Sequence, residues 1–346
     1  MRALFVVFSL LCASLVRAQS LSAHATAVIE QAISDMESGS PDLAIDALRR
    51  LIHDEPDALA AHYELATAYS IAGDFAHVIA VTRPLRARND VSDIAFVLEG
   101  DALDAVGRRS EAIECYKAGL KRFPASPRLF LQLGLVAEDD DDPQLALQYY
   151  TSGIQADKSF PGNYYHATSL LLQSSEPVMG LIYGSTFRVL SPDGQQSRLV
   201  SDLLVKCLRA NVRHSDAGPV VSLSSSSSLF LAPDGRMHLP LPAAFNLAVK
   251  NSKATSAFLS SHDELSLQAI ATLKRDVIGF LRDKFADEFF SGILAWEEEV
   301  AAAGHWDAYC FWLLRLGDEG EFNAWMAFHE DDLEQFALWF QEHPLF

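Results

Sequence analysis

Apolar positions in the first half of the chain follow helical spacing and fall into pairs of helices. Leu59–Ile71 and Phe75–Arg86 are the clearest pair, in which Leu65 and Tyr69 stand where a helix faces a partner. Gly73 separates the two stretches, and glycine supplies the left-handed conformation that ends a helix at little cost. The pattern therefore predicts a helix, a tight turn and a second helix.

This helix pair recurs with a period of 34 residues. Four kinds of position repeat in phase: a small or aliphatic residue early in the second helix, a turn residue, a closing proline and a small residue in the first helix. In that order they are Ala44, Val78, Ala112 and Ala146; Gly39, Gly73, Gly107 and Asp141; Pro56 and Pro124; and Ala32, Ala66, Gly100 and Gly134. One pair cannot bury its own apolar face, so neighbouring pairs are expected to stack into a superhelix.

These offsets resemble the tetratricopeptide repeat, whose consensus has an aromatic, Leu-Gly, Tyr, Ala, an aromatic and Pro at the same places. The third unit fills them with Phe96, Gly100, Ala112, Tyr116 and Pro124. The fourth has Phe130, Leu133, Gly134, Ala146 and Tyr150. The resemblance implies an all-α, right-handed superhelical solenoid whose units span about 25–58, 59–92, 93–126 and 127–160.

A fifth, diverged unit follows in phase at 161–194, with Tyr164 as its first aromatic and Gly180 at the small position. The helix Ser197–Val212 is expected to cap the last exposed face. Together they predict about five helix pairs with a capping helix over residues 22–213.

Two further stretches are similar to uncharacterised exported bacterial repeat proteins that carry a C-terminal helical region. One is Pro177–Gly184, where those proteins commonly have Trp in place of Met179, and the other is the end of the chain from Glu321 to Leu345. This resemblance implies localisation in the cell envelope and no known activity.

The N-terminus has the form of a secretory signal. Arg2 precedes the apolar run Ala3–Val16, and Val16-Arg17-Ala18 fits a cleavage site, so residues 1–18 are predicted to be removed. The run is shorter than the roughly 20 residues of a membrane-spanning helix. A buried first helix, or a lipid anchor at Cys12, are the alternatives. We expect a mature chain without a membrane span, in the periplasm or secreted.

The net charge excludes some classes of partner, and the cysteines indicate whether disulfides are expected. The formal net charge of −19 argues against nucleic acid and against an anionic membrane surface. Cys115, Cys207 and Cys310 of the mature chain are widely scattered, which is not a disulfide framework, so buried and unreactive thiols are expected.

Composition changes after residue 213. Residues 214–241 contain a run of serines and Pro233-Asp234-Gly235 between two short apolar runs, which predicts a small β-hairpin beside a flexible linker. The serines alternating with Val221 and Leu223 also fit a solvated strand. Residues 242–346 are predicted to form a helical domain, with an aromatic-rich core, docked on the last repeat. Its expected helices are Leu265–Phe285, Gly292–Ala303, Ala308–Leu316, Glu321–Phe328 and Leu333–Phe340.

No catalytic constellation with the required spacing occurs in the sequence. Phosphate-loop, dinucleotide and nucleophile-elbow motifs are absent, and no cofactor is implied. His329-Glu330-Asp331-Asp332-Leu333 begins like a zinc helix but lacks the second histidine. Asp139–Asp142 lacks the pattern of a calcium loop and is expected to be a solvated turn. An unrecognised enzyme or small-ligand domain, using His262, His305 and Asp307, is one alternative function, and a self-assembling structural protein is another.

The better candidate is the inner wall of the solenoid, which the first helix of each unit lines in repeats of this kind. The same offsets give Tyr63, Thr67, Ser70, Asp101, Asp104, Arg128, Leu131, Leu135, Glu138, Tyr165 and Gln173. Tyrosines with scattered acids suit an extended or helical segment with some positive charge. The sequence therefore predicts a non-enzymatic scaffold or adaptor of the bacterial envelope that binds a protein or peptide.

Overall fold

The protein is all-α apart from short hairpins in the computed structural model, which describes residues 21–215, 218–224, 230–231, 237–253, 255, 265–289 and 291–346. The predicted signal peptide lies outside these residues. The chain divides into two compact units, one up to Tyr149 and the other Tyr150–Phe346. Each unit is described by itself.

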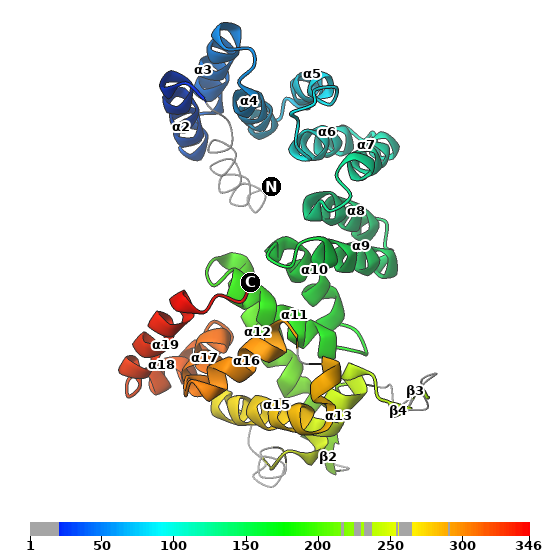
Figure 1. Cartoon of the computed structure of the whole chain (residues 1–346), viewed down its shortest axis with the longest axis vertical. Coiled ribbons are helices and arrows are strands. Elements are labelled where there is room, and N and C mark those ends of the chain that lie inside the picture. The colour runs from blue at the N-terminus through cyan, green and yellow to red at the C-terminus, as the bar shows by residue number, and fades with distance from the viewer. Residues whose placement is uncertain are drawn as a thin grey trace. The chain divides into compact units, whose positions relative to one another are not determined.

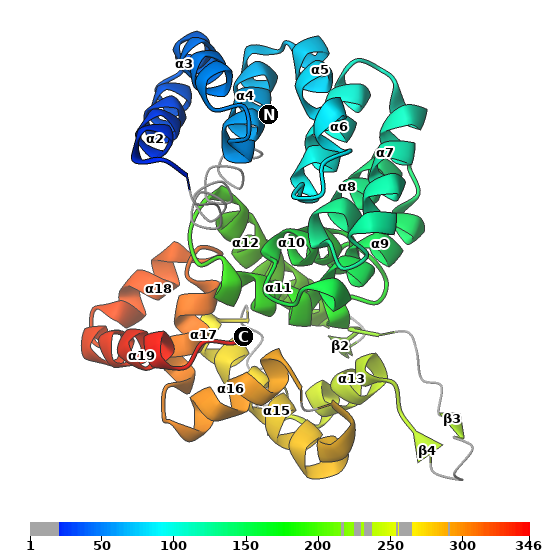
Figure 2. The same cartoon turned by 45° about the horizontal axis from the view of Figure 1, so that its top comes forward.

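Unit 1 is a row of stacked helix pairs (Figures 1 and 2). Its helices are α2 (Ala23–Glu37), α3 (Pro41–Asp54), α4 (Leu59–Ala72), α5 (Phe75–Leu85), α6 (Ile94–Ala105), α7 (Arg109–Arg122), α8 (Pro127–Asp139) and the start of α9 (Pro143–Ala156). The first helices form a continuous series, in which α2 packs on α4, α4 on α6 and α6 on α8. The predicted stacking of equivalent pairs is confirmed.

The turn inside each pair has the predicted left-handed residue. Gly39, Gly73 and Gly107 have φ of 82°, 77° and 79°, and Asp141, their equivalent, has φ of 56°. In every case the next residue donates its N–H to the carbonyl five residues back, for example Asp74 to Tyr69 at 2.8 Å. The same helix ending therefore occurs four times, with aspartate replacing glycine once.

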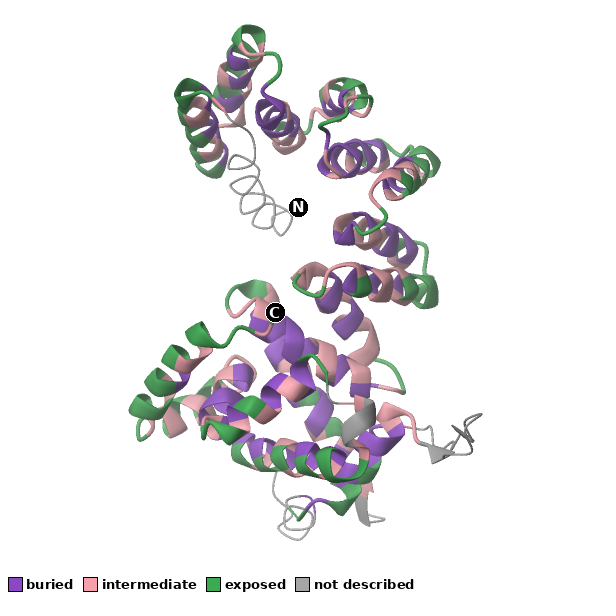
Figure 3. Cartoon of the chain, viewed as in Figure 1, coloured by how far each residue is buried: buried purple, intermediate pink, exposed green. Residues whose placement is uncertain are grey.

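Small residues set the distance between paired helices. Ala44, Ala112 and Ala146 have no exposed surface. A Cβ on Gly100 would overlap the ring of Tyr116 on α7, so only glycine fits at that position without movement. The interior helices α4 and α6 are covered on most sides (Figure 3).

After the end of α9, unit 2 continues with the fifth helix pair and its cap. These are α10 (Pro161–Leu172), α11 (Val178–Leu190) and α12 (Gln195–Asn211), which pack on one another. Two antiparallel hairpins follow, β1 (Val212–Ser215) with β2 (Gly218–Val221), and β3 (Phe230–Leu231) with β4 (Met237–His238). The second is the hairpin that the sequence predicts. The first replaces part of the predicted linker.

Of the remaining helices of unit 2, α13, α16 and α17 pack against α11 or α12, α15 packs on these three, and α18 and α19 pack on α17. They are α13 (Leu241–Asn251), α15 (Leu267–Phe289), α16 (Ile293–Ala302), α17 (Trp306–Leu314), α18 (Glu319–Met326) and α19 (Glu330–Glu342). Trp296 and Trp306 are buried in the core, as expected for an aromatic-rich helical region, whereas α18 and α19 are largely exposed (Figure 3). Non-helical backbone at Phe285 inside α15 falls where the sequence predicts that helix to end.

Candidate functional site

The partly exposed side of α4, α6 and α8, here called the first-helix face, carries most of the predicted binding residues. Because neighbouring helices bury both flanks of α4 and α6, only a narrow stripe of side chains remains accessible. Eight predicted residues are partly exposed on this face: Thr67, Ser70, Asp101, Asp104, Arg128, Leu131, Leu135 and Glu138.

Tyr63 is not on this face, which corrects the prediction for that residue. Its side chain is 1% exposed, and its hydroxyl accepts hydrogen bonds from the Ser92 N–H at 2.9 Å and the Ser92 hydroxyl at 3.2 Å. Burial raises the pKa of the Tyr63 phenol. Tyr63 therefore connects the second repeat to the start of the third repeat, and its buried side chain cannot contact a partner.

Asp101 is the most perturbed acid of the first-helix face. Its carboxylate accepts a hydrogen bond from the Tyr116 hydroxyl at 2.7 Å. Burial, reinforced by the neighbouring Asp104, raises the pKa of Asp101 to about 7. The buried Tyr116 hydroxyl therefore holds one oxygen of the Asp101 carboxyl group. Because the pKa of Asp101 is about 7, its neutral, protonated form is populated near pH 7.

Arg109 of α7 neutralises acids at the ends of two first helices. Its guanidinium lies 4.0 Å from Asp104, 3.1 Å from Asp139 and 3.2 Å from Asp140. It also donates to the Val136 carbonyl at 3.1 Å, near the end of α8. These acids therefore have a structural partner, which reduces the negative potential of this end of the face.

The acidic run that follows α8 forms an exposed turn, as expected. Asp141 takes the left-handed position, and Asp142 accepts the Leu145 N–H at 2.9 Å at the start of α9. Among the described residues no group of histidine, cysteine or acid side chains is arranged to hold a metal ion.

Arg128 and the leucines of α8 supply a different chemistry. The Arg128 guanidinium pairs with Asp93 at 3.3 Å, and Asp93 also accepts the Ser126 hydroxyl at 2.6 Å. Leu131 and Leu135 lie one turn apart and are partly exposed. The face at α8 is therefore apolar in its middle and charged at its ends.

Tyr165 and Gln173 belong to α10 of unit 2. Tyr165 is half-buried with its ring 5.5 Å from that of Phe187. Gln173 is exposed at the end of α10 and donates to the Ser169 carbonyl at 2.8 Å. Both remain accessible within their own unit.

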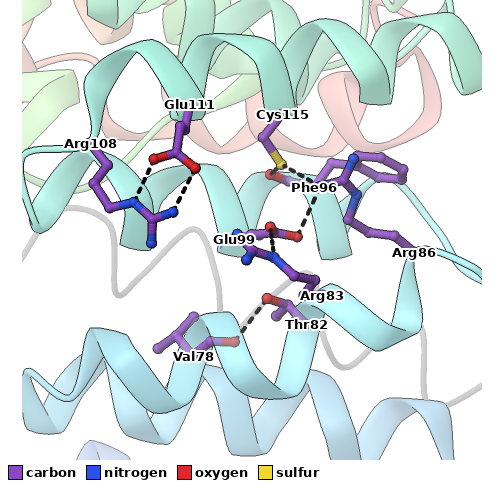
Figure 4. A network of polar contacts seen from close by, with 9 residues as sticks. All are labelled: Val78, Thr82, Arg83, Arg86, Phe96, Glu99, Arg108, Glu111 and Cys115. Carbon is purple, nitrogen blue, oxygen red and sulfur yellow. Dashed lines mark hydrogen bonds and ion pairs between the residues drawn. The ribbon is translucent and has the colours of Figure 1, made fainter.

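One charged cluster escaped the sequence analysis. Glu99 has no exposed surface, yet its carboxylate pairs with Arg83 of α5 at 2.9 Å and with Arg86, the residue after α5, at 3.2 Å (Figure 4). Arg86 also lies over the Phe96 ring, 4.8 Å from its centroid. An acid inside the buried run of α6 was the available signal, because such a group needs charged partners.

Two residues of the rival catalytic group have partners within unit 2. Asp307 pairs with Arg275 at 3.1 Å, and the His305 ring lies 5.8 Å from that of Trp339. His262 lies outside the described residues. His329 of the zinc-like stretch stacks on Trp325 and is hydrogen-bonded to the Trp325 carbonyl at 2.8 Å, a structural arrangement.

Comparison with known proteins identifies a repeat in the first half of the chain. The tetratricopeptide repeat profile matches residues 29–76 and 97–161, and no catalytic family is detected. PilF of Pseudomonas aeruginosa has 21% identity and a TM-score of 0.44, with 54% of this chain and 83% of that one covered. A tetratricopeptide repeat protein of Thermus thermophilus has 18% identity and a TM-score of 0.43, covering 54% and 97%.

A longer alignment is found with the C-terminal part of a repeat protein of Cytophaga hutchinsonii. It has 13% identity and a TM-score of 0.40, with 84% of this chain and 96% of that one covered. No curated protein matches the sequence. The profile match falls on the stacked pairs with their four equivalent turns, so residues 29–76 and 97–161 of the chain match the tetratricopeptide repeat.

Proposed function

We propose that the chain is a non-enzymatic scaffold or adaptor that binds a segment of another protein on the first-helix face. The supporting observation is the continuous row of α2, α4, α6 and α8, which displays a stripe of partly exposed side chains on a rigid support. Tyr165 and Gln173 of α10 are the corresponding candidates in unit 2. Repeats of this family bind protein partners in general, which agrees with this role.

The chemistry of the face selects a segment that is apolar in its middle and carries some positive charge. Leu131 and Leu135 offer apolar contact, and Asp101 and Glu138 offer acceptors for Lys or Arg. Arg109 and Arg128 already pair with neighbouring acids, so the attraction for a basic segment is moderate. Binding should weaken as salt rises, but only partly, because the apolar contacts are not screened.

Site-specific photocrosslinking tests the proposal. A photoreactive phenylalanine analogue is placed at Thr67 or Leu131, which lie on the first-helix face, in the chain that starts at Gln19. The same analogue at Glu114 of α7, whose side chain is 77% exposed, is the matched control. The expected result is a discrete crosslinked protein from an envelope extract at the two face positions and little or none at Glu114.

The alternatives give different outcomes. Crosslinks to a second copy of the chain would indicate self-assembly. Equal capture of many proteins at all three positions would contradict a specific face.

We also propose that the chain is exported and that the envelope is where it meets its partner. This rests on the signal-like N-terminus of the sequence. Within the described ranges, no helix is long and apolar enough to cross a membrane. N-terminal sequencing of the chain from a cell-envelope fraction should give Gln19 as the first residue. Recovery in the cytoplasm with Met1 retained would refute export.

A further inference from the structure

A small cavity lies inside unit 2, away from the first-helix face. Helices α11, α12, α13, α15, α16 and α17 line it, its volume is about 30 Å³, and it is partly open. Eleven of its 14 lining residues are apolar, among them the buried Leu181, Leu204 and Ile293. The other three are Ser185, Lys274 and Glu297.

The three polar side chains are joined in one group, in which Ser185 and Glu297 are buried and the Lys274 side chain is 17% exposed. Lys274 Nζ lies 2.9 Å from Glu297 Oε1 and 3.3 Å from the Ser185 hydroxyl. The Tyr309 hydroxyl donates to the same Glu297 oxygen at 2.6 Å. Ser185 is 3% exposed, Glu297 2% and Tyr309 0%. We call Ser185, Lys274 and Glu297 the polar floor of the cavity. A few polar groups among apolar walls are typical of a small-molecule site.

Charge at this floor is already balanced. The ammonium of Lys274 and the carboxylate of Glu297 cancel, so a charged ligand would enter an apolar cavity without a free counter-charge. An ammonium group carries three N–H donors, and the two contacts to Glu297 and Ser185 leave one for a ligand. The floor therefore favours an uncharged head that accepts a hydrogen bond.

Size limits what can be enclosed. A cavity of this volume holds about two water-sized groups, so the head and the first carbon of a ligand would fill it. The rest of an aliphatic tail would lie along the apolar walls towards the opening. We propose that this cavity binds short, uncharged aliphatic molecules with one hydrogen-bond acceptor, the class of small alcohols and ketones.

The test uses the mature chain and the linear alcohols from 1-propanol to 1-hexanol. Methyl NMR titration should show saturable shifts confined to the methyl groups of lining residues such as Leu181 and Ile293. Affinity should rise about fourfold for each added CH₂ until the walls end, the gain expected for burying one methylene. Butanoate and butylammonium should bind at least about tenfold more weakly than 1-butanol.

Two variants that introduce phenylalanine form a matched pair, one inside the cavity and one outside it as the control. Ile293→Phe fills the cavity without touching its polar floor and should abolish the saturable shifts. Leu247→Phe enlarges a leucine of α13 that is 42% exposed and should leave the affinity unchanged. Direct magnetisation transfer between 1-butanol and the Ile293 methyl group checks the site in the unaltered chain, so the proposal can be judged even if Ile293→Phe fails to fold.

Three results would overturn the proposal: no saturable shifts, affinity that does not depend on chain length, or butanoate and 1-butanol binding equally. In the first case the cavity holds only water. None of these results bears on the first-helix face, whose test is separate.

Discussion

Asp101 shows how a single side chain of the repeat acquires unusual acid–base behaviour. Its pKa rises from 3.8 to about 7 because the carboxyl group is buried beside Asp104. The folded chain therefore binds this proton more tightly than the unfolded chain does. Stability from this group is fully present below about pH 4 and is lost as pH rises through about 7.

Replacing the carboxyl group with an amide should remove this pH dependence. In Asp101→Asn the amide oxygen can still accept the Tyr116 hydroxyl, but no charge develops in the buried position. Thermal unfolding followed by circular dichroism should give matching midpoints near pH 4 and a higher midpoint for the variant at pH 8. Glu114→Gln, at an exposed position, should follow the unaltered chain throughout. Parallel curves for Asp101→Asn and the unaltered chain would contradict the explanation.

Cys115, Cys207 and Cys310 should be unreactive while the chain is folded. All are buried, and burial raises the pKa of the Cys115 thiol to about 12 and that of Cys207 to about 11, with Cys310 raised as well. The thiolate is the reactive form, so it is scarce at pH 8. Mass spectrometry after iodoacetamide treatment should find no label on these three cysteines without denaturant and a label on each of them in urea. Rapid labelling of any thiol in the folded chain would argue against its burial.

Residue-level reasoning from the sequence has a definite limit in this fold. Offsets within the repeat predict the helix on which a side chain lies, and eight of the nine candidates in unit 1 are partly exposed. The offsets do not show which side chain the next repeat covers. Tyr63 is buried because its hydroxyl is hydrogen-bonded to Ser92, 29 residues later. Such a contact depends on how adjacent pairs are placed, which local periodicity does not encode.

At the scale of elements, two helical glycines have opposite expected roles. A Cβ on Gly100 would overlap the Tyr116 ring, so Gly100→Ala should destabilise the chain by about 1–3 kcal/mol through overpacking. Gly279 is an exposed residue of α15 with nothing within 4 Å of an added Cβ. Gly279→Ala should stabilise the chain by about 0.5–1 kcal/mol through helix propensity. Denaturant unfolding of both variants measures the difference, and shifts of the same sign would refute it.

Helices were more predictable than strands for a physical reason. Each helix supplies several turns of apolar periodicity, and the paired turns add glycine at fixed positions, so most helices lie within a few residues of their predicted bounds. The β3–β4 hairpin carried a Pro-Asp-Gly turn signal, and the sequence predicted it. The β1–β2 hairpin has strands of four residues directly after α12, too short for periodicity to separate from the end of a helix.

At the scale of the whole molecule, the sequence placed a compositional boundary after residue 213. The structure describes a larger body, because α13, α16 and α17 pack on α11 or α12 within residues 150–346. The expectation that this region docks on the last repeat is met. Arg188 of α11 joins the last repeat to the end of α17. The sequence did not predict this contact, because an arginine near a helix end usually reaches solvent.

Arg188 should be a main stabilising contact of unit 2. It has no exposed surface, and its guanidinium donates to the carbonyls of Leu313 at 3.1 Å and Trp312 at 3.3 Å, at the end of α17. Burial lowers the pKa of Arg188 to about 10, which still leaves it charged at neutral pH. A cation at a helix C-terminus is favoured by the helix dipole, and hydrogen bonds from a charged donor are stronger than those between neutral groups.

Arg188→Met keeps much of the side-chain volume but removes the charged donor, so the Leu313 carbonyl keeps only the Ser201 hydroxyl and the Trp312 carbonyl only Arg315. The loss of these charge-assisted hydrogen bonds should lower the free energy of unfolding by about 3 kcal/mol. All five tryptophans lie in unit 2, so tryptophan fluorescence in a urea titration reports this unit directly. Arg198→Met, at an exposed position of α12 paired with Glu319, should change stability by less than about 0.5 kcal/mol. If the two variants unfolded at the same urea concentration, the buried arginine would not be what holds the C-terminal helices to the last repeat.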